Sequence, residues 1–254
     1  MTTRDNRSPL PIVVAALGTL ALLAYGFYQG MYAAPEESTM GAIQRIFYYH
    51  VPSAWTAGVL FFVNFVASVL YLWRRGPRMD AWALASAEVG VVFCTVVLIT
   101  GPLWAKPVWG IWWTWDARLT STLILWLIYV SYLLLRRFSE GPSAPVIAAC
   151  LAIFGFLDEP IVYMSIRWWR TQHPQPVFAG GQNSGIAPEM RFAVLVNWAA
   201  FLAMAALVTW FRYKLARRDQ ERVEAAALAS LQRIDTEIPT SIAGMELPRR
   251  TGGD

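Results

Sequence analysis

The chain has 254 residues, of which 56% are hydrophobic and 15% charged, and its formal net charge is +4. The charged residues are unevenly distributed, and several stretches of about twenty residues hold none or only one or two. This pattern indicates an integral membrane protein and excludes an ordinary water-soluble domain, while the small positive charge by itself indicates neither a nucleic-acid partner nor an acidic ligand.

Six apolar segments are long enough to cross a bilayer, whose hydrocarbon core of about 30 Å requires roughly 20 helical residues. Helices satisfy their own backbone hydrogen bonds in lipid. In chain order the segments are Leu10–Tyr28, Ser53–Trp73, Ala81–Gly101, Leu119–Leu135, Pro145–Ser165 and Phe192–Phe211. The sequence therefore predicts an all-α integral membrane protein, with a six-transmembrane-helix bundle in residues 1–211 and a C-terminal segment in residues 212–254.

The first apolar segment and the residues after the last span each need a separate interpretation. The first apolar segment follows Arg4 and Arg7, as in a secretory signal peptide, but it is longer than the usual apolar region of roughly 7–15 residues. We expect it to be a retained span. After the last span, the chain to about Glu237 is rich in Ala, Leu, Arg and Glu, which predicts a continuing helix, and the final GMELPRRTGGD is predicted to be disordered.

The basic residues indicate the orientation of the spans. Fifteen of the 21 Lys and Arg residues lie on the side of the two termini and of the connections after the second and fourth spans, and six lie on the other side. The positive-inside rule places the richer side in the cytoplasm. We therefore expect two cytoplasmic termini and three outward-facing connections: Gln29–Pro52, Pro102–Arg118 and Ile166–Arg191.

The chain has two histidines, His50 and His173, and both fall in the connections that are expected to face outward. Each has a proline close by, in the sequences YYHVPSAW and WWRTQHPQP, and proline stiffens the backbone that precedes it. A single histidine near a membrane surface is more often an interfacial or hydrogen-bonding residue. Two histidines on one side of the membrane, with tryptophans between them in the chain, favour ligand binding.

The stretch Trp109–Thr120, WGIWWTWDARLT, holds four tryptophans within seven residues and then an acid and a base. Pro107 suits the first position of a helix, although Gly110 is unfavourable within one. A helix starting at Pro107 would present one face formed by Trp109, Trp112, Trp113 and Asp116. A belt of tryptophans at the lipid headgroups is the simpler explanation, but a belt requires neither this spacing nor Asp116 and Arg118.

Haem is the ligand that suits this combination of residues. Its iron takes axial histidine ligands, its large ring packs against indoles, and its propionates pair with arginines. Zinc is a weaker alternative, since two histidines and scattered acids lack the close ligand spacing of zinc motifs. Cys94 and Cys150 lie within predicted spans, form no C-x-x-C motif, and are expected to be small apolar packing residues.

The sequence resembles a known family. WGIWWTWDARLTS is similar to the tryptophan-rich WWD motif of haem-handling membrane proteins in cytochrome c maturation. RIFYYHVPSAW and PIVYMSIRWWRTQHP resemble the two histidine-bearing regions of the haem exporter protein C family, CcmC. The resemblance covers roughly Leu10–Arg212. It implies a subunit, not itself an enzyme, that holds haem b non-covalently and transiently at the periplasmic face of the bacterial inner membrane and delivers it to the periplasmic chaperone CcmE.

The resemblance also implies partners and site residues. The partners are the ATPase CcmA, the membrane subunit CcmB and the small subunit CcmD of an ABC-type complex, together with membrane lipid, and no nucleic acid. His50 and His173 would be the axial ligands of the haem iron. Further haem-binding residues would come from the tryptophan-rich loop, residues 102–120: Trp109, Trp112, Trp113, Trp115, Asp116 and Arg118.

Two alternative functions are disfavoured by the same residues. A cytochrome c haem lyase belongs to the same WWD group, but such synthases carry additional histidines inside their spans and this chain has none. A transmembrane cytochrome b would require histidines within its helices. A substrate permease would more often show repeated halves or broken helices.

Three acidic residues fall inside predicted spans, where ionisable groups are costly. We expect Glu88, Asp158 and Glu159 to serve in hydrogen bonds between helices or in contacts with partner subunits, although a proton-linked or propionate-side function is the alternative. Pro160 follows the last two acids and is expected to kink the fifth span near its outer end.

Overall fold

The computed structural model describes residues 10–139, 141–174, 178 and 185–242, with side chains as far as residue 233. Within these ranges the chain is helical between its connections and contains no β-strand. Six helical segments are long and apolar enough to cross a membrane, which confirms the predicted multi-pass architecture. The predicted disordered C-terminal residues lie outside the described ranges.

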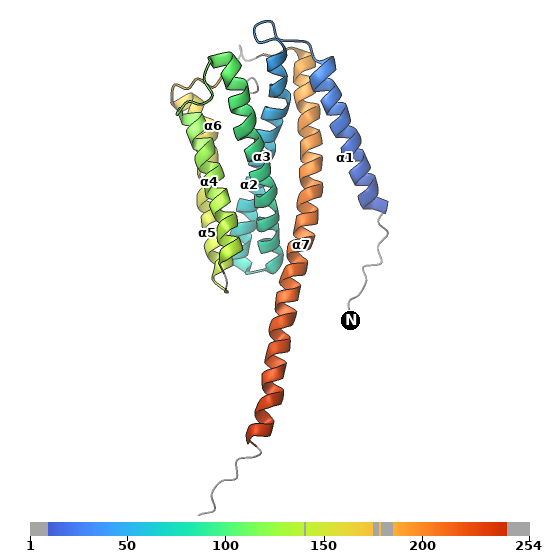
Figure 1. Ribbon diagram of the computed structural model, residues 1–254, viewed down its shortest axis with the longest axis vertical. Coiled ribbons are helices and arrows are strands. Elements are labelled where there is room, and N and C mark those ends of the chain that lie inside the picture. Colours follow the sequence, from blue (N-terminus) through green and yellow to red (C-terminus); the bar gives the residue numbers. More distant parts are fainter. Residues whose placement is uncertain (1–9, 140, 175–177, 179–184, 243–254) are drawn as a thin grey trace, which may run out of the picture.

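The helices are long and follow one another closely. In chain order they are α1 (Leu10–Tyr28), α2 (Phe47–Arg74), α3 (Pro77–Trp109), α4 (Ala117–Phe138), α5 (Ala144–Phe156), α6 (Asp158–Trp168) and α7 (Pro188–Ile242), as labelled in Figure 1. A π-helical turn, Gln29–Ala33, continues α1, and a 3-10 turn, Ala42–Ile46, leads into α2. Most of the helices are longer than the predicted spans because they continue beyond the charge-free windows.

The helices α2 and α3 form an antiparallel hairpin at the centre of the bundle. Helices α4, α5 and α6 lie on one side of this hairpin and α7 lies on the other (Figure 1). Helix α1 packs chiefly against α7, where the amide of Asn197 donates a hydrogen bond to the carbonyl oxygen of Gly26 at 2.9 Å. Helix α1 therefore lies at the edge of the bundle and makes most of its contacts with α7.

Small residues on α3 allow the central helices to approach closely. A Cβ atom added to Gly90 would lie 2.7 Å from a ring carbon of Phe61, so only glycine leaves room for this aromatic side chain of α2. Phe61 in turn stacks on Tyr129 of α4, with ring centroids 3.8 Å apart. Because lipid is as apolar as the side chains, such close contacts rather than hydrophobicity hold membrane helices together.

The sequence predicts a kink at Pro160 near the outer end of the fifth span, and the structure instead divides this span into two helices close to its middle. Helix α5 ends at Phe156 and α6 begins at Asp158, four and two residues before Pro160. The ring of a proline clashes with the carbonyl group four residues earlier, here that of Phe156, and proline has no N–H to donate to it. The interruption turns the start of α6 into a separate helical end that carries Asp158 and Glu159.

Helix α7 runs well beyond the bundle and extends five residues past the predicted end at Glu237. Its 55 residues correspond to a length of about 80 Å, compared with about 30 Å for a hydrocarbon core. Figure 1 shows the C-terminal part of α7 projecting from one end of the bundle. Near that end Arg212 donates two hydrogen bonds to the carboxylate of Glu88, at 2.6 and 2.7 Å, which supports the structural interpretation of Glu88.

A buried polar cluster ties three helices together at the same end. The guanidinium of Arg136, at the end of α4, donates to both oxygens of the buried Asp80 carboxylate in the first turn of α3, at 2.5 and 2.8 Å. Gln220 of α7 donates to the same carboxylate at 2.8 Å. Asp80 therefore joins α3, α4 and α7.

We expect Arg136→Ala to destabilise the protein, because it leaves the carboxylate of Asp80 buried without its cation. The loss should be about 3–5 kcal/mol of the free energy of unfolding, the range for breaking a buried ion pair. Thermal unfolding of the detergent-solubilised protein measures it. Arg137→Ala, which removes an exposed neighbour, is the control, and equal effects of the two variants would contradict the assignment.

Candidate functional site

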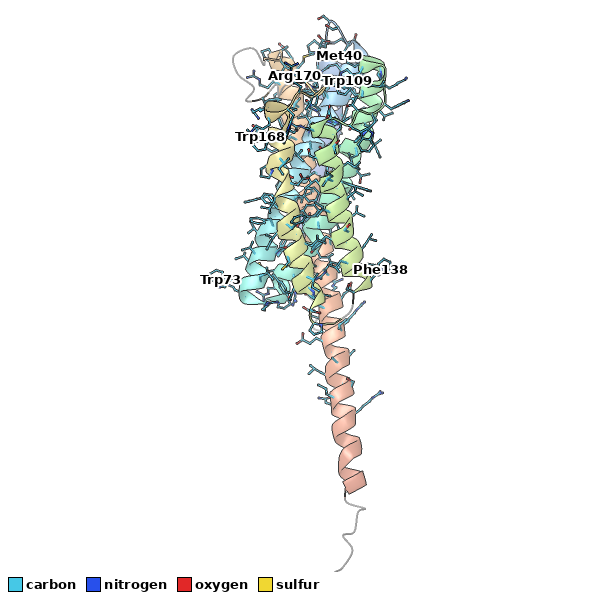
Figure 2. The ribbon with its side chains drawn as sticks, turned by 90° about the vertical axis from the view of Figure 1, so that its left-hand side faces the viewer. Met40, Trp73, Trp109, Phe138, Trp168 and Arg170 are labelled. Carbon is cyan, nitrogen blue, oxygen red and sulfur yellow. The ribbon has the colours of Figure 1, made fainter. Side chains whose placement is uncertain are left out.

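A cavity of about 600 Å³ opens among α2, α3, α4 and α6, at the end of the bundle opposite the projecting part of α7. In Figure 2 this end is marked by Met40, Trp109, Trp168 and Arg170, and the opposite end by Trp73 and Phe138. The cavity walls are mainly apolar, and the two histidines of the chain both belong to its lining. Its volume lies in the range typical of pockets for organic ligands, roughly 300–1,000 Å³.

His50 lies within α2, one turn from its start, and not in the connection where the sequence predicts it. The 3-10 turn before α2 leads directly into the helix, and the aromatic residues Phe47–Tyr49 suit the headgroup region, so the helix starts six residues before the charge-free segment. The ring of His50 lies against α3, where a Cβ added to Gly101 would be 3.6 Å from its Cε1 atom.

A hydrogen bond to Thr100 fixes the tautomer of His50. The Nδ1 atom lies 2.8 Å from the hydroxyl oxygen of Thr100, and that hydroxyl donates its only proton to the carbonyl oxygen of Val96 at 2.7 Å. Because the hydroxyl proton is engaged, Thr100 accepts and the His50 Nδ1 donates. The Nε2 atom then carries a free lone pair, as a metal ligand requires.

His173 follows α6 in the connection where the sequence predicts it, and it is half-buried. Its Nδ1 lies 2.9 Å from the carbonyl oxygen of Pro174. A carbonyl oxygen only accepts, so this nitrogen also carries the proton and Nε2 has the free lone pair. Burial and the nearby Arg118 guanidinium lower the pKa of His173, which favours the neutral imidazole, the form that binds metals.

The tryptophan-rich stretch does not form the predicted short helix. Helix α3 continues through Pro107 and ends at Trp109, and Gly110 adopts a left-handed conformation with φ of 79°. Its N–H donates to the carbonyl oxygen of Lys106 at 3.0 Å, and the Lys106 ammonium donates to its carbonyl oxygen at 2.9 Å. Glycine reaches this conformation without strain, so Gly110 closes the helix and residues 110–116 form a loop.

The tryptophans of this stretch lie in two environments, the cavity lining and the exposed surface. Trp109 and Trp113 line the cavity, and Trp104, one turn earlier on α3, packs edge-to-face against Trp109 with ring centroids 5.1 Å apart. Trp112 and Trp115 are 55% and 77% exposed and do not line the cavity. The single aromatic face expected from helical spacing is therefore replaced by an inward pair and an outward pair.

Asp116 also lies outside the lining of the cavity, although the sequence places it among the ligand-binding residues. Its carboxylate instead caps α4, accepting a hydrogen bond from the backbone N–H of Leu119 at 2.9 Å. Five predicted site residues line the cavity: His50, His173, Trp109, Trp113 and Arg118. Three do not: Trp112, Trp115 and Asp116.

Three charged side chains line the cavity: Glu37, which precedes the 3-10 turn, and Arg118 and Glu159, which lie near the starts of α4 and α6. Arg118, in the first turn of α4, donates to the backbone carbonyl of Tyr163 at 3.3 Å. Glu159, near the start of α6, lies over α2, where a Cβ added to Gly58 would be 2.5 Å from a carboxylate oxygen. Glu159 thus lies at the cavity as well as between helices, whereas the favoured interpretation from sequence gave it only a structural function. Pro160 was the sequence signal that could have placed Glu159 near the start of a helix.

Unpartnered polar atoms gather at the cavity. The Nε1 of Trp113, the Nε of Arg118 and one carboxylate oxygen of Glu159 are buried and have no hydrogen-bond partner among the described residues. Buried polar groups are costly when left unpaired, so these three atoms suit a ligand that has an apolar body and polar substituents at its edge. No group of three His, Cys, Asp or Glu side chains that could hold a metal ion occurs in the described ranges.

Thr100 and Trp104 belong to the cavity site although the sequence did not identify them, and for Glu159 the sequence favoured a structural function over the propionate-side alternative. Trp104 falls within residues 102–120, the predicted tryptophan-rich loop, but was not among the expected haem-binding residues. Thr100 gave no signal, because it is fifty residues from His50 along the chain and meets it only through the register between α2 and α3.

Comparison with known proteins places the chain in a family. The family model for haem exporter protein C matches residues 6–227. Haem exporter protein C of Bradyrhizobium diazoefficiens is 42% identical over 177 residues, which cover 69% of this chain and 66% of that protein. The Escherichia coli protein of the same name is 34% identical over 202 residues, or 78% and 80% of the two chains. That of Paracoccus denitrificans is 33% identical over 231 residues, or 90% and 92%. The chain therefore belongs to the haem exporter protein C family.

Proposed function

We propose that this protein binds haem in the cavity beside the tryptophan-rich loop and passes it to a periplasmic haem chaperone for the maturation of c-type cytochromes. The observation that carries the proposal is the pair of histidines at one cavity, each with Nδ1 engaged and Nε2 free. In this arrangement His50 and His173 are the axial ligands of the iron. Haem is the transported cargo, held non-covalently and transiently as haem b.

The remaining cavity residues match the other parts of haem. The apolar walls suit the porphyrin ring, and Trp109 and Trp113 offer aromatic faces or edges to it. Arg118 supplies a cation for a propionate, and its unpartnered Nε is a donor for that group. The cavity volume, its apolar lining and its few polar atoms at the site therefore support one flat amphipathic ligand.

Delivery requires that a partner protein reach the bound haem. The exposed Trp112 and Trp115 lie in the same loop as the inward-facing pair, so we propose that they form the surface presented to the chaperone CcmE. Membership of the haem exporter family supports the further partners, the ATPase CcmA and the membrane subunits CcmB and CcmD. The protein itself is then a membrane subunit without an enzymatic activity of its own, in the bacterial inner membrane.

The orientation in the membrane follows from the basic residues. The end of the bundle with the projecting α7 carries the arginine-rich turn after α2 and the arginines at the end of α4, so we propose that this end and both termini are cytoplasmic. The cavity then opens toward the periplasm, where the chaperone would collect haem.

The ligation is tested with His50→Ala, His173→Ala and the double variant. We expect the wild type to bind ferric haem with the absorption and electron paramagnetic resonance spectra of a low-spin, bis-imidazole iron. Each single variant should lose that low-spin signature, because one axial bond is missing, and should retain part of its haem through the cavity walls. Cells with either variant should make little c-type cytochrome.

The double variant gives the sharper result, since the chain has no third histidine. A double variant that retains the wild-type low-spin spectrum and full haem content would refute ligation by these two residues. Met40→Leu, which changes another lining residue of the cavity, is the control and should leave the spectrum unchanged.

Substitutions of Thr100 test whether its hydrogen bond to Nδ1 orients His50 for haem binding. Thr100→Val removes the acceptor of the Nδ1 proton while keeping the side-chain shape, so we expect haem affinity to fall about 10–100-fold, the usual effect of losing the hydrogen-bond partner of a metal-binding histidine. Thr100→Ser should restore most of the affinity. Haem titration followed by absorption measures both, and equal affinities for Val and wild type would show that this hydrogen bond has no influence on haem binding.

The orientation is tested with reporters fused after residue 242. A cytoplasmic reporter should be active there, and alkaline phosphatase, which requires export, should be inactive. Alkaline phosphatase inserted between Ile111 and Trp112 should be active, because the loop is expected in the periplasm. The opposite pattern at either position would invert the proposed direction of haem delivery.

A further inference from the structure

The carboxylate of Asp116 connects the tryptophan-rich loop to the segment that carries His173. One oxygen, Oδ1, accepts the backbone N–H of Leu119 at 2.9 Å and so caps α4. The other oxygen, Oδ2, accepts the backbone N–H of Gln172 at 3.2 Å and the hydroxyl of Thr114 at 3.3 Å. Gln172 is the residue immediately before His173.

In this arrangement the carboxylate of Asp116 binds groups of the protein outside the cavity. Both oxygens already accept hydrogen bonds, and the residue does not line the cavity. A carboxylate beside the propionates would also repel them, since both are negatively charged. A direct contact between Asp116 and the cargo therefore does not fit the structure.

We propose that Asp116 is a positioning residue for His173: it fixes the backbone of the His173 segment against the start of α4, so that the imidazole faces the cavity. The inference rests on the proposed function of His173 as an iron ligand. Asp116, the acid of the tryptophan-rich motif, then orients the second axial ligand and does not contact haem.

The segment around His173 depends on such a connection. It follows the end of α6 at Trp168 and has no regular secondary structure. Its two local hydrogen bonds, from the His173 ring to Pro174 and from the Thr171 hydroxyl to the His173 carbonyl, join neighbours and fix no position relative to the bundle. The bond from Gln172 to Asp116 is the described hydrogen bond that anchors residues 171–174 to a helix of the bundle.

A carboxylate suits this task because its two oxygens accept from two backbone segments at once. Asparagine at the same position has one acceptor oxygen, and it is as good a helix cap as aspartate. Asp116→Asn can therefore keep the cap of α4 and lose the bond to Gln172. This variant therefore tests the positioning of His173 without removing the cap that stabilises α4.

The first measurement uses the haem-free protein. In Asp116→Asn we expect faster hydrogen exchange in residues 171–174, while exchange in α4 and the melting temperature stay close to wild type. Thr114→Val is the matched control, because it removes another partner of the same oxygen without touching the connection to Gln172. It should leave exchange in residues 171–174 unchanged.

The second measurement uses the same variants with ferric haem. Asp116→Asn should bind haem through His50 with a mainly high-spin spectrum, and added imidazole should restore the low-spin spectrum by filling the vacant axial position. Gln172→Pro removes the donor N–H from the other side of the bond, leaves α4 untouched, and should give the same result.

The outcomes separate this inference from the proposed function. If His173→Ala retains the low-spin spectrum, His173 is not a ligand and the proposed function fails. If His173→Ala loses that spectrum while Asp116→Asn keeps both the spectrum and the slow exchange of residues 171–174, only the positioning function of Asp116 is overturned. Loss of haem content in Asp116→Asn without recovery by imidazole would instead indicate direct contact with haem and would also overturn it.

Discussion

The register between α2 and α3 is the constraint on which the rest of the structure depends. In this antiparallel hairpin, successive contacts join residues that lie progressively farther from the turn. Nearest the turn, Asn64 donates a hydrogen bond to the carbonyl oxygen of Ala83. Phe61 then packs over Gly90, and at the far end His50 is hydrogen-bonded to Thr100. Close packing at Gly90 permits no shift along the helix, because any larger residue would meet the ring of Phe61. The pairing that orients His50 at the cavity is thus maintained by contacts deep within the bundle.

The cavity is formed by helix ends, where backbone and polar side chains can be exposed without meeting lipid. Its charged residues and histidines come from the connection before α2, from the first turns of α2, α4 and α6, and from the segment after α6, while the middle of the helices supplies mainly apolar packing. This division follows from the cost of unpaired polar groups in a bilayer. The break in the fifth span at Leu157 has the same consequence, because it places Glu159 near a helix start beside the cavity.

The sequence predicted the features that depend on composition along the chain. The six spans, the irregularity of the fifth span around Pro160 and the gathering of both histidines with Trp109, Trp113 and Arg118 at one end all agree with the structure, although a kink was expected where the helix is broken. Helical periodicity failed for the tryptophan-rich loop, because the left-handed conformation of Gly110 ends α3 before the expected face can form. The hydrogen bonds of Thr100 and Asp116 link residues about fifty positions apart. Such contacts depend on how helices are placed in space, which a single sequence does not reveal.

The central claim is that haem lies inside the bundle, between His50 and His173, and not on the exposed surface of the tryptophan-rich loop. The most direct measurement is an electron cryo-microscopy map of the full chain loaded with ferric haem. The account predicts planar density in the cavity, with the iron between the Nε2 atoms of the two histidines and a propionate directed toward Arg118. Density stacked on Trp112 and Trp115, with the cavity empty, would contradict it.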